Sequence, residues 1–183
     1  MMGILRNTTE LSHVLSEGYL SADIIAVDAT CGNGHDTLWL AERCRRVYSF
    51  DIQEKAVETA EKLTEEHDNI TYIVDSHENL RAYIDESVGY IIFNLGYLPG
   101  GDKNITTIAD STMKAVADGL ELLSVGGLMC IVMYWGHDAG KIERERVLDF
   151  AGKLDKHEYH VIKTDMLNQD GTPPEILLIE KKK

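Results

Sequence analysis

The sequence is poor in cysteine and proline and has no long apolar run. Its 183 residues include three prolines and three cysteines, Cys31, Cys44 and Cys130. No two cysteines have the C-x-x-C spacing of a zinc or redox site, so we expect buried, reduced thiols and no metal. No apolar run approaches the roughly 18–20 residues that cross a bilayer, and the first residues soon turn polar, unlike a signal peptide. We therefore expect a soluble, cytoplasmic protein without a membrane partner.

Basic residues are also scarce. The chain has 18 lysines and arginines against 31 acidic residues, a formal net charge of −13. A large nucleic-acid footprint normally needs a basic face, so this balance argues against broad binding to nucleic acid, although not against a local patch. Basic residues do gather late in the chain, and we expect them on solvated helix faces and a frayed tail. They are Lys141, Arg144, Arg146, Lys153, Lys156, Lys163 and the last three lysines.

Short apolar runs alternate with segments of helical periodicity, which predicts a single α/β domain over residues 1–183 with helices on both faces of a mostly parallel sheet. No helix-length segment separates the last two strands, so we expect them to pair as an antiparallel hairpin. By analogy, a seven-stranded parallel sheet closed in this way is typical of class I methyltransferases, which are Rossmann-like. A turn is predicted at Gly126 and Gly127. The predicted strands are 24–27, 47–51, 70–75, 88–94, 128–134, 159–164 and 176–180, and the predicted helices are 9–18, 36–44, 54–65, a short one through 84, 107–123 and 141–154.

The first motif is the turn DATCGNGHDT at residues 28–37, which follows a strand and opens a helix. Its glycines let the backbone approach a ligand, and the helix N-terminus offers free N–H groups. A dinucleotide fingerprint needs a third glycine where this chain has Thr37. The carboxylate of Asp28 would repel a pyrophosphate but suits the ammonium of an amino acid, directly or through water. These features predict a site for S-adenosyl-L-methionine (SAM).

Polar residues also end the second and third strands. Asp51 lies 23 residues after Asp28, and a carboxylate at about that spacing accepts both ribose hydroxyls of a nucleoside. Ile52 is placed to cover the adenine. Taken alone, such an aspartate is often only a helix cap. Asp75, Ser76 and His77 end the third strand and either read the adenine edge or, through Ser76 or Asp75, cap the next helix.

The segment NLGYLPGGDK at 94–103 ends the fourth strand, and YWGHDAG at 134–140 follows the fifth. Ligands of doubly wound folds bind at the carboxyl ends of the strands, so the transferred methyl should face residue 94. Asn94 supplies a carbonyl that positions an amine, and Tyr97 a ring and a hydroxyl. The aromatics and His137 of the second segment either stack on a base and assist proton removal or pack on the rim of the core. We expect His13, His67, His157 and His160 to be structural or exposed.

Together, the motifs at 28–37 and 94–103 resemble the YtqB-like (MnmM) family of small bacterial SAM-dependent methyltransferases. The resemblance runs from about His13 to the C-terminus. The chain has Thr30 where generic methyltransferases have glycine, and Ala139 where the family has the first glycine of a pair. Family members methylate the amine of 5-aminomethyl-2-thiouridine at the tRNA wobble position, giving 5-methylaminomethyl-2-thiouridine. The resemblance thus implies tRNA, through its anticodon loop, as the substrate and a homodimer as the assembly.

Motifs and resemblance together define the candidate site. The cofactor-binding candidates are Asp28, Thr30, Gly32, Asn33, Gly34, Asp36, Thr37, Asp51, Ile52, Gln53, Ser76, His77 and Asn94. The substrate-binding candidates are Leu95, Gly96, Tyr97, Leu98, Tyr134 and His137, and the catalytic candidates are Asn94, Tyr97 and His137. Two other readings remain open: a SAM-dependent methyltransferase of rRNA or of a small molecule, and a non-catalytic nucleotide-binding module. An NAD-dependent oxidoreductase is disfavoured by Asp28 and the missing third glycine.

Overall fold

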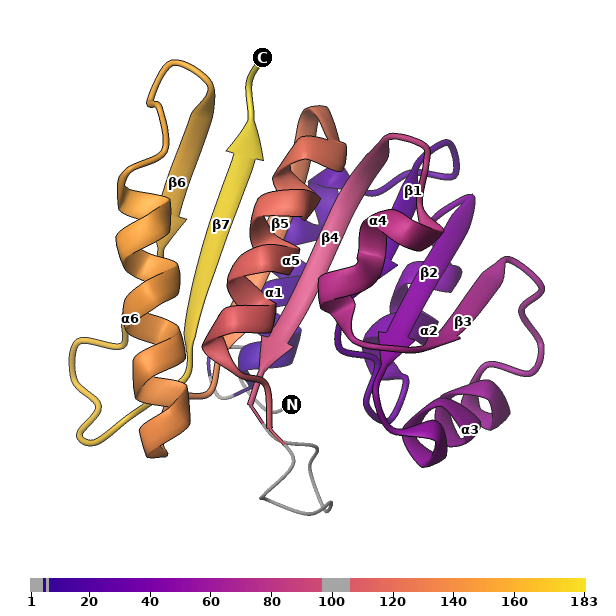
Figure 1. Ribbon diagram of the computed structural model, residues 1–183, viewed down its shortest axis with the longest axis horizontal. Coiled ribbons are helices and arrows are strands. Elements are labelled where there is room, and N and C mark those ends of the chain that lie inside the picture. The colour runs from indigo at the N-terminus through magenta and orange to yellow at the C-terminus, as the bar shows by residue number, and fades with distance from the viewer. Residues whose placement is uncertain (1–4, 6, 97–105) are drawn as a thin grey trace.

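The sheet has seven strands in the order β3-β2-β1-β4-β5-β7-β6 (Figure 1). The structure, a computed structural model, describes residue 5 and residues 7–96 and 106–183. Strands β1 to β5 are parallel, and β7 runs antiparallel to both β5 and β6. The predicted doubly wound α/β fold with an antiparallel C-terminal hairpin is therefore confirmed. The strands are β1 Ile25–Asp28, β2 Arg46–Asp51, β3 Ile70–Val74, β4 Val88–Leu95, β5 Leu123–Met133, β6 Tyr159–Lys163 and β7 Glu175–Lys181.

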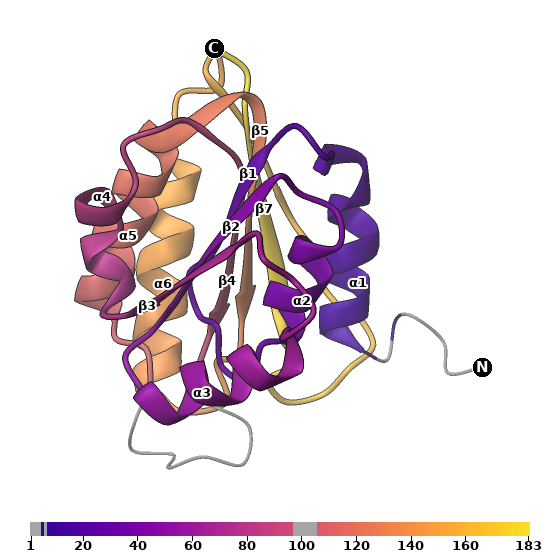
Figure 2. The same cartoon turned by 90° about the vertical axis from the view of Figure 1, so that its right-hand side faces the viewer.

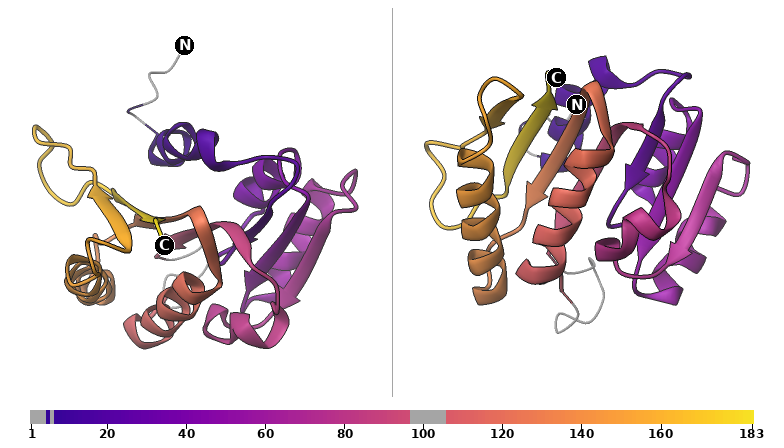
Figure 3. Two further views of the ribbon diagram at one scale, coloured as in Figure 1. Left: turned by 90° about the horizontal axis from the view of Figure 1, so that it is seen from above. Right: turned by 45° about the horizontal axis from the view of Figure 1, so that its top comes forward.

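Helices cover both faces of the sheet. In Figure 2, α1 and α2 lie on one side and α4, α5 and α6 on the other. The left view of Figure 3 likewise places α1 and α5 on opposite sides. None of the described helices is long and apolar enough to cross a bilayer. The helices are α1 Thr8–Ser16, α2 His35–Ala41, α3 Glu54–Leu63, α4 Leu80–Tyr83, α5 Ala109–Leu122 and α6 Asp138–Gly152, with the 3₁₀ turns η2 Glu17–Tyr19 and η3 His77–Asn79.

The central strand β4 is buried on both faces because both helical layers pack on it. Successive side chains of a strand point to opposite faces. Accordingly, Ile91 and Phe93 pack in the core beneath α5 and α6, whereas Tyr90 and Ile92 pack in the core beneath α1 and α2. The continuous apolar sequence of this strand thus follows from its central place in the sheet.

The order of the strands creates a crevice at one edge of the sheet. The chain moves outward from β1 through β2 to β3 and then returns to β4 on the other side of β1. The carboxyl ends of these parallel strands meet at the lower edge in Figure 1. The loops after β1 and β4 leave in opposite directions at this switch point, which is where ligands of doubly wound folds bind.

Two local predictions were wrong. Helix α6 begins at Asp138 rather than residue 141, because Asp138 favours the N-terminal end of a helix and pairs with Lys141 at 3.0 Å. The predicted turn at Gly126 and Gly127 lies inside β5, as an irregularity. Pairing with β4 jumps from Leu123 to Leu128, and Gly126 takes a φ of 80° between them.

Candidate active site

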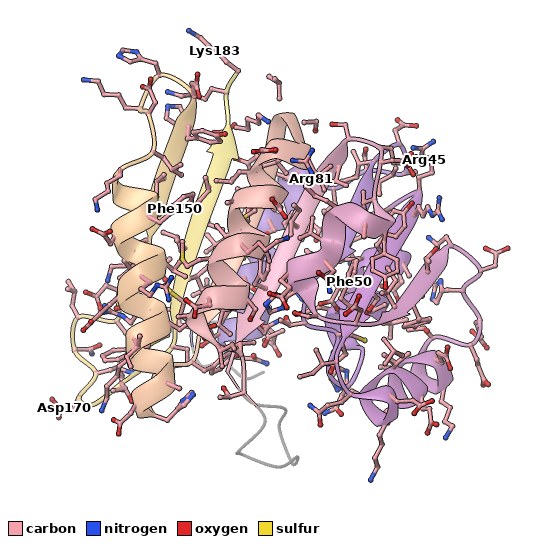
Figure 4. The ribbon with its side chains drawn as sticks, viewed as in Figure 1. Arg45, Phe50, Arg81, Phe150, Asp170 and Lys183 are labelled. Carbon is pink, nitrogen blue, oxygen red and sulfur yellow. The ribbon has the colours of Figure 1, made fainter. Side chains whose placement is uncertain are left out.

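A cavity of about 270 Å³ opens at the carboxyl ends of β1 to β4. Eight of the predicted cofactor-binding residues line it. They are Thr30, Gly32, Asp51, Ile52, Gln53, Ser76, His77 and Asn94. Phe50, labelled in Figure 4, also contributes to the wall from β2. The structure therefore brings residues from all four predicted segments, those that follow β1, β2, β3 and β4, to one wall at the switch point of the sheet.

Asp51 joins the loops that follow β1 and β2. One carboxylate oxygen accepts a hydrogen bond from the backbone N–H of Gly32, and the other accepts one from the N–H of Gln53, both at 2.9 Å. Each oxygen retains a further lone pair for a ligand. Asp51 thus holds the glycine turn and presents a carboxylate at the cavity wall, while the exposed side chain of Ile52 follows it along the wall.

Gly34 is required for packing rather than for contact with the cavity. Its φ is 84°, and a Cβ at this position would lie 2.6 Å from Cβ of Ala60 on α3. Only glycine adopts this backbone conformation without strain and also allows the helices to approach so closely. Gly34 does not line the cavity, so its predicted contact with the cofactor has no counterpart in this wall.

Asp28 lies behind the wall. Its carboxylate is fully buried and accepts hydrogen bonds from the Thr30 N–H at 3.2 Å and the Thr37 hydroxyl at 2.6 Å. Burial, with a further contribution from the negative charge of Asp36, raises the pKa of Asp28 to about 7. Neither Asp28 nor Thr37 lines the cavity, because both side chains point into the packing beneath the loop. In this position Asp28 supports the loop and does not reach a ligand ammonium directly.

His77 carries an unsatisfied ring nitrogen beside the cavity. Its Nδ1 lies 3.1 Å from the carbonyl oxygen of Ala29, which can only accept, so Nδ1 carries the hydrogen. Burial lowers the pKa of His77, which keeps the ring neutral. Within the part of the chain that the structure describes, the buried Nε2 has no hydrogen-bond partner. Ser76 next to it caps η3 by accepting from the N–H of Glu78, so the capping alternative holds for Ser76 while the residue also lines the cavity.

A second cavity, of about 580 Å³, lies on the other side of Asn94. It is bounded by the N-terminal end of α1, the glycine turn and the residue after β5. Its lining includes Asn7, Thr9, Asn33, His35, Asp36 and Tyr134. Asn33 and Asp36, which are also predicted to bind the cofactor, line this second cavity and not the first. Thr30, Gly32, Asn94 and Gly96 line both cavities, so the two meet at the end of β4.

The end of β4 is fixed from both sides. The backbone N–H of Asn94 donates to the Thr30 hydroxyl at 2.7 Å, and the N–H of Gly96 donates to the Thr107 hydroxyl at 3.0 Å. The Thr107 hydroxyl in turn donates to the carboxylate of Glu143 on α6 at 2.7 Å. Burial raises the pKa of Glu143. These contacts hold the junction of the two cavities in place.

Some of these residues carry no sequence signal. Thr106, Thr107, Ile108 and Ser111 line the first cavity, but no motif marks them, because they reach it only through the placement of α5. The His13 ring, expected to be structural or exposed, lies 2.6 Å from Asp36. Only the packing of α1 against α2 brings these two residues together.

Other predicted substrate residues lie elsewhere. Leu95 is buried in the core beneath α5, because adjacent strand residues face opposite sides and Asn94 faces the cavities. His137 precedes α6, with Nε2 at 3.2 Å from the Thr106 hydroxyl, and lines neither cavity. Tyr134 does line the second cavity. Tyr97 and Leu98 lie outside the described residues.

The late aromatic and basic residues are largely engaged in structural contacts. Trp135 donates its ring N–H to the carbonyl of Pro173 at 2.9 Å and stacks on Arg144, so it packs on the rim rather than facing a cavity. Arg144 and Lys163 both bind the buried carboxylate of Glu175, at 2.6 and 3.0 Å. Arg144 and Lys163 thus serve the fold, whereas Lys141, Arg146 and Lys153 lie on solvated helix faces, as expected. Surface pairs join Lys141 to Asp138, Arg146 to Asp110 and Lys153 to Asp149.

The three cysteines are buried and unpaired, as expected. Burial raises the pKa of the Cys31 thiol to about 12, so it stays protonated. Among residues 7–96 and 106–183, no three histidine, cysteine or acidic side chains are grouped as ligands for a metal ion.

Comparison with solved structures defines the class of the protein. A structure from Clostridium thermocellum described as a "putative rRNA-methylase" is 40% identical, with a TM-score of 0.92, and the match covers 96% of this chain and 97% of that one. A "putative methyltransferase" from Streptococcus mutans, in complex with S-adenosylhomocysteine (SAH), is 37% identical, with a TM-score of 0.90 and 99% of both chains covered. The fold, the cavity and these relatives define a class I SAM-dependent methyltransferase.

Sequence comparison gives the family. The family model described as "Putative rRNA methylase" matches residues 47–180, and the chain belongs to this family. A tRNA (mnm(5)s(2)U34)-methyltransferase, chloroplastic, of Arabidopsis thaliana is 32% identical over 96% of this chain and 70% of its own length. The predicted membership of the YtqB-like methyltransferases is thereby confirmed.

Proposed function

We propose that this protein transfers a methyl group from SAM to the amine of 5-aminomethyl-2-thiouridine at wobble position 34 of tRNA. Its similarity to a plant tRNA (mnm(5)s(2)U34)-methyltransferase over nearly the whole chain supports the substrate. One structural observation carries the mechanism: the first cavity, which we assign to the cofactor and call the cofactor cavity, meets the second cavity at Asn94. A methyl donor in one cavity and an amine in the other would approach each other at this residue.

The first cavity has groups that suit the adenosyl part of SAM. Asp51 would accept hydrogen bonds from the ribose hydroxyls, and Ile52 would cover the adenine ring. The unpartnered Nε2 of His77 is an acceptor, which matches the amino group of adenine, a donor. Gly32 allows close approach of the backbone. Bound there, SAM supplies an electrophilic methyl group on a sulfonium.

The second cavity would take the modified base. Tyr134 offers an aromatic face for stacking, the usual way to hold an unstacked RNA base. The side-chain carbonyl of Asn94 would accept an N–H of the substrate amine, so that the nitrogen lone pair points toward the first cavity. The amine must be neutral to react. The catalytic roles of Tyr97 and His137 stay predictions.

The acidic surface is compatible with a small RNA target. A net charge of −13 disfavours extensive contact with phosphates. A single anticodon loop requires only stacking and a few contacts, and stacking contributes about 1–3 kcal/mol per base. The family resemblance additionally favours a homodimer working in the cytoplasm.

Nucleoside mass spectrometry of tRNA from a strain lacking this gene tests the proposal. We expect 5-aminomethyl-2-thiouridine to accumulate and its methylated product to disappear. The wild-type gene should restore the product, and an Asn94→Ala gene should not. Unchanged wobble methylation in a strain without a second such enzyme would favour rRNA or a small molecule as the substrate, and restoration by Asn94→Ala would remove Asn94 from the mechanism.

A further inference from the structure

A line of hydrogen-bonded side chains connects α1 to the junction of the two cavities. Nε2 of His13 lies 2.6 Å from Oδ1 of Asp36, and Oδ2 of Asp36 accepts from the amide nitrogen of Asn94 at 2.6 Å. The three residues come from α1, α2 and β4. His13 and Asp36 do not line the cofactor cavity, whereas Asn94 does. The line therefore approaches the reaction site from the side of the substrate.

Asp36 determines which way the Asn94 amide faces. An amide group can be reversed with little change in shape, but an ionised carboxylate only accepts hydrogen bonds. With Asp36 buried against it, the NH₂ group of Asn94 must face Asp36, and its carbonyl oxygen must face away. The backbone N–H of Asn94 is held separately by Thr30. Both the position and the orientation of the acceptor oxygen are therefore fixed.

His13 in turn fixes the orientation of the Asp36 carboxylate, because the position of the His13 ring is itself held by packing. The His13 ring stacks on Trp39 with centroids 3.8 Å apart and an angle of 2° between the planes. Trp39 is held in turn by an edge contact with Tyr90. A ring packed in this way cannot turn freely, so its N–H remains directed at Asp36. Both oxygens of Asp36 are then engaged, one by His13 and one by Asn94.

We propose that His13 and Asp36 are positioning residues that orient the Asn94 carbonyl toward the amine that accepts the methyl group. This methyltransferase would thereby select a nucleophile that carries an N–H. This inference rests on the proposed function, since it concerns the amine in the second cavity. The nitrogen forms a bond to the methyl carbon as the C–S bond breaks and its electron pair passes to sulfur. The surplus proton on nitrogen passes to solvent. A reversed Asn94 would present NH₂ to the amine and turn its lone pair away.

The orientation of Asn94 can be tested without any substrate. In the ¹⁵N-labelled full chain, the Asn94 side-chain amide is assigned by its loss in Asn94→Ala. We expect one of its protons to resonate downfield and exchange slowly, and both properties to be lost in Asp36→Ala and weakened in His13→Leu. His160→Leu is the matched control, because His160 pairs with Glu180 on the distant hairpin. An Asn94 amide that is the same in Asp36→Ala and wild type overturns the proposal.

Kinetics then separate positioning from a merely structural role. Because small misplacements cost up to about a hundredfold in rate, we expect kcat on tRNA to fall roughly tenfold to a hundredfold in His13→Leu. His13→Gln, whose amide can still donate to Asp36, should recover most of the loss. In both variants the KM for SAM and the Kd for SAH should stay within about twofold of the wild-type values, since His13 does not line the cofactor cavity. Equal activity of the Leu and Gln variants contradicts the proposal. If the wild type methylates no tRNA, the proposed function fails, and the amide spectra still decide the orientation of Asn94.

Discussion

Replacement of Asp51 by asparagine tests the cofactor site most sharply. Asp51 accepts backbone hydrogen bonds from Gly32 and Gln53, and we propose that it also accepts from the ribose hydroxyls. Hydrogen bonds to a charged group contribute about 1.5–3 kcal/mol each. Asp51→Asn keeps one acceptor oxygen and loses the other, so one such bond to the ligand is lost. Since about 1.4 kcal/mol is a factor of ten, the Kd for SAH should rise roughly 10- to 150-fold.

A ligand without ribose hydroxyls separates this effect from damage to the glycine turn. Titration calorimetry would measure SAH and its 2′,3′-dideoxy analogue on wild type and Asp51→Asn. The wild type should strongly prefer SAH, and the variant should lose most of that preference. Asp155→Asn is the matched control, because Asp155 accepts the N–H of His157 two residues on, as Asp51 does from Gln53, but far from the cavity. If the preference for SAH survives in Asp51→Asn, the ribose assignment is refuted.

Three further predictions concern residues around the glycine turn. Gly34→Ala should destabilise the fold by at least about 1–3 kcal/mol, as a non-glycine residue there is strained and its Cβ would overlap Ala60; thermal unfolding measures this. The wild type should prefer SAH to its inosine analogue, because the oxygen of the analogue would face the unpartnered Nε2 of His77. His77→Phe should lose this preference, which competition binding measures. For Asp28 the folded pKa is raised to about 7, so the folded state retains a proton that the unfolded state releases. Between about pH 4 and 7 stability should therefore fall as pH rises, and Asp28→Asn should lack this decline in denaturant unfolding.

A specific result would contradict each of these three predictions. Gly18→Ala meets nothing within 4 Å and Gly126→Ala meets only backbone strain, so the loss of stability should increase from Gly18 to Gly126 to Gly34. Any other order contradicts the packing argument. If the wild type binds SAH and its inosine analogue with equal affinity, His77 does not recognise adenine. A stability difference between wild type and Asp28→Asn that is the same at pH 5 and pH 8 would show that burial does not hold a proton on Asp28.

The fold and much of the wall of the first cavity could be predicted because their signals are local. Buried strands appear as apolar runs, and a carboxylate at the end of the second strand must lie beside the glycine turn when the strands are parallel. The strand-end positions of Asp51 and His77 predict this placement, and the family resemblance implies it for Gln53; all three line the first cavity.

The remaining features depend on contacts between distant elements. Asp36 follows the glycine turn directly, so the motif suggested the cofactor, but its carboxylate faces His13, 23 residues away on α1. Nothing in the sequence around His13 marks this contact. Thr107 likewise reaches the end of β4 only because α5 and α6 pack together around Glu143. The segment after β5 predicts that Trp135 either stacks on a base or packs on the rim of the core. Its ring N–H donates to the carbonyl of Pro173, which is distant in the sequence, so the ring packs on the rim.

Methyl transfer to tRNA from the deletion strain tests the central claim most directly. The purified protein would be incubated with isotopically labelled SAM and this tRNA, and the nucleosides would be separated by mass spectrometry. We predict that the label appears in 5-methylaminomethyl-2-thiouridine, with an equal loss of 5-aminomethyl-2-thiouridine. Protein that binds SAH but leaves every tRNA nucleoside unlabelled would contradict wobble-uridine methylation, while the class of the enzyme would stand.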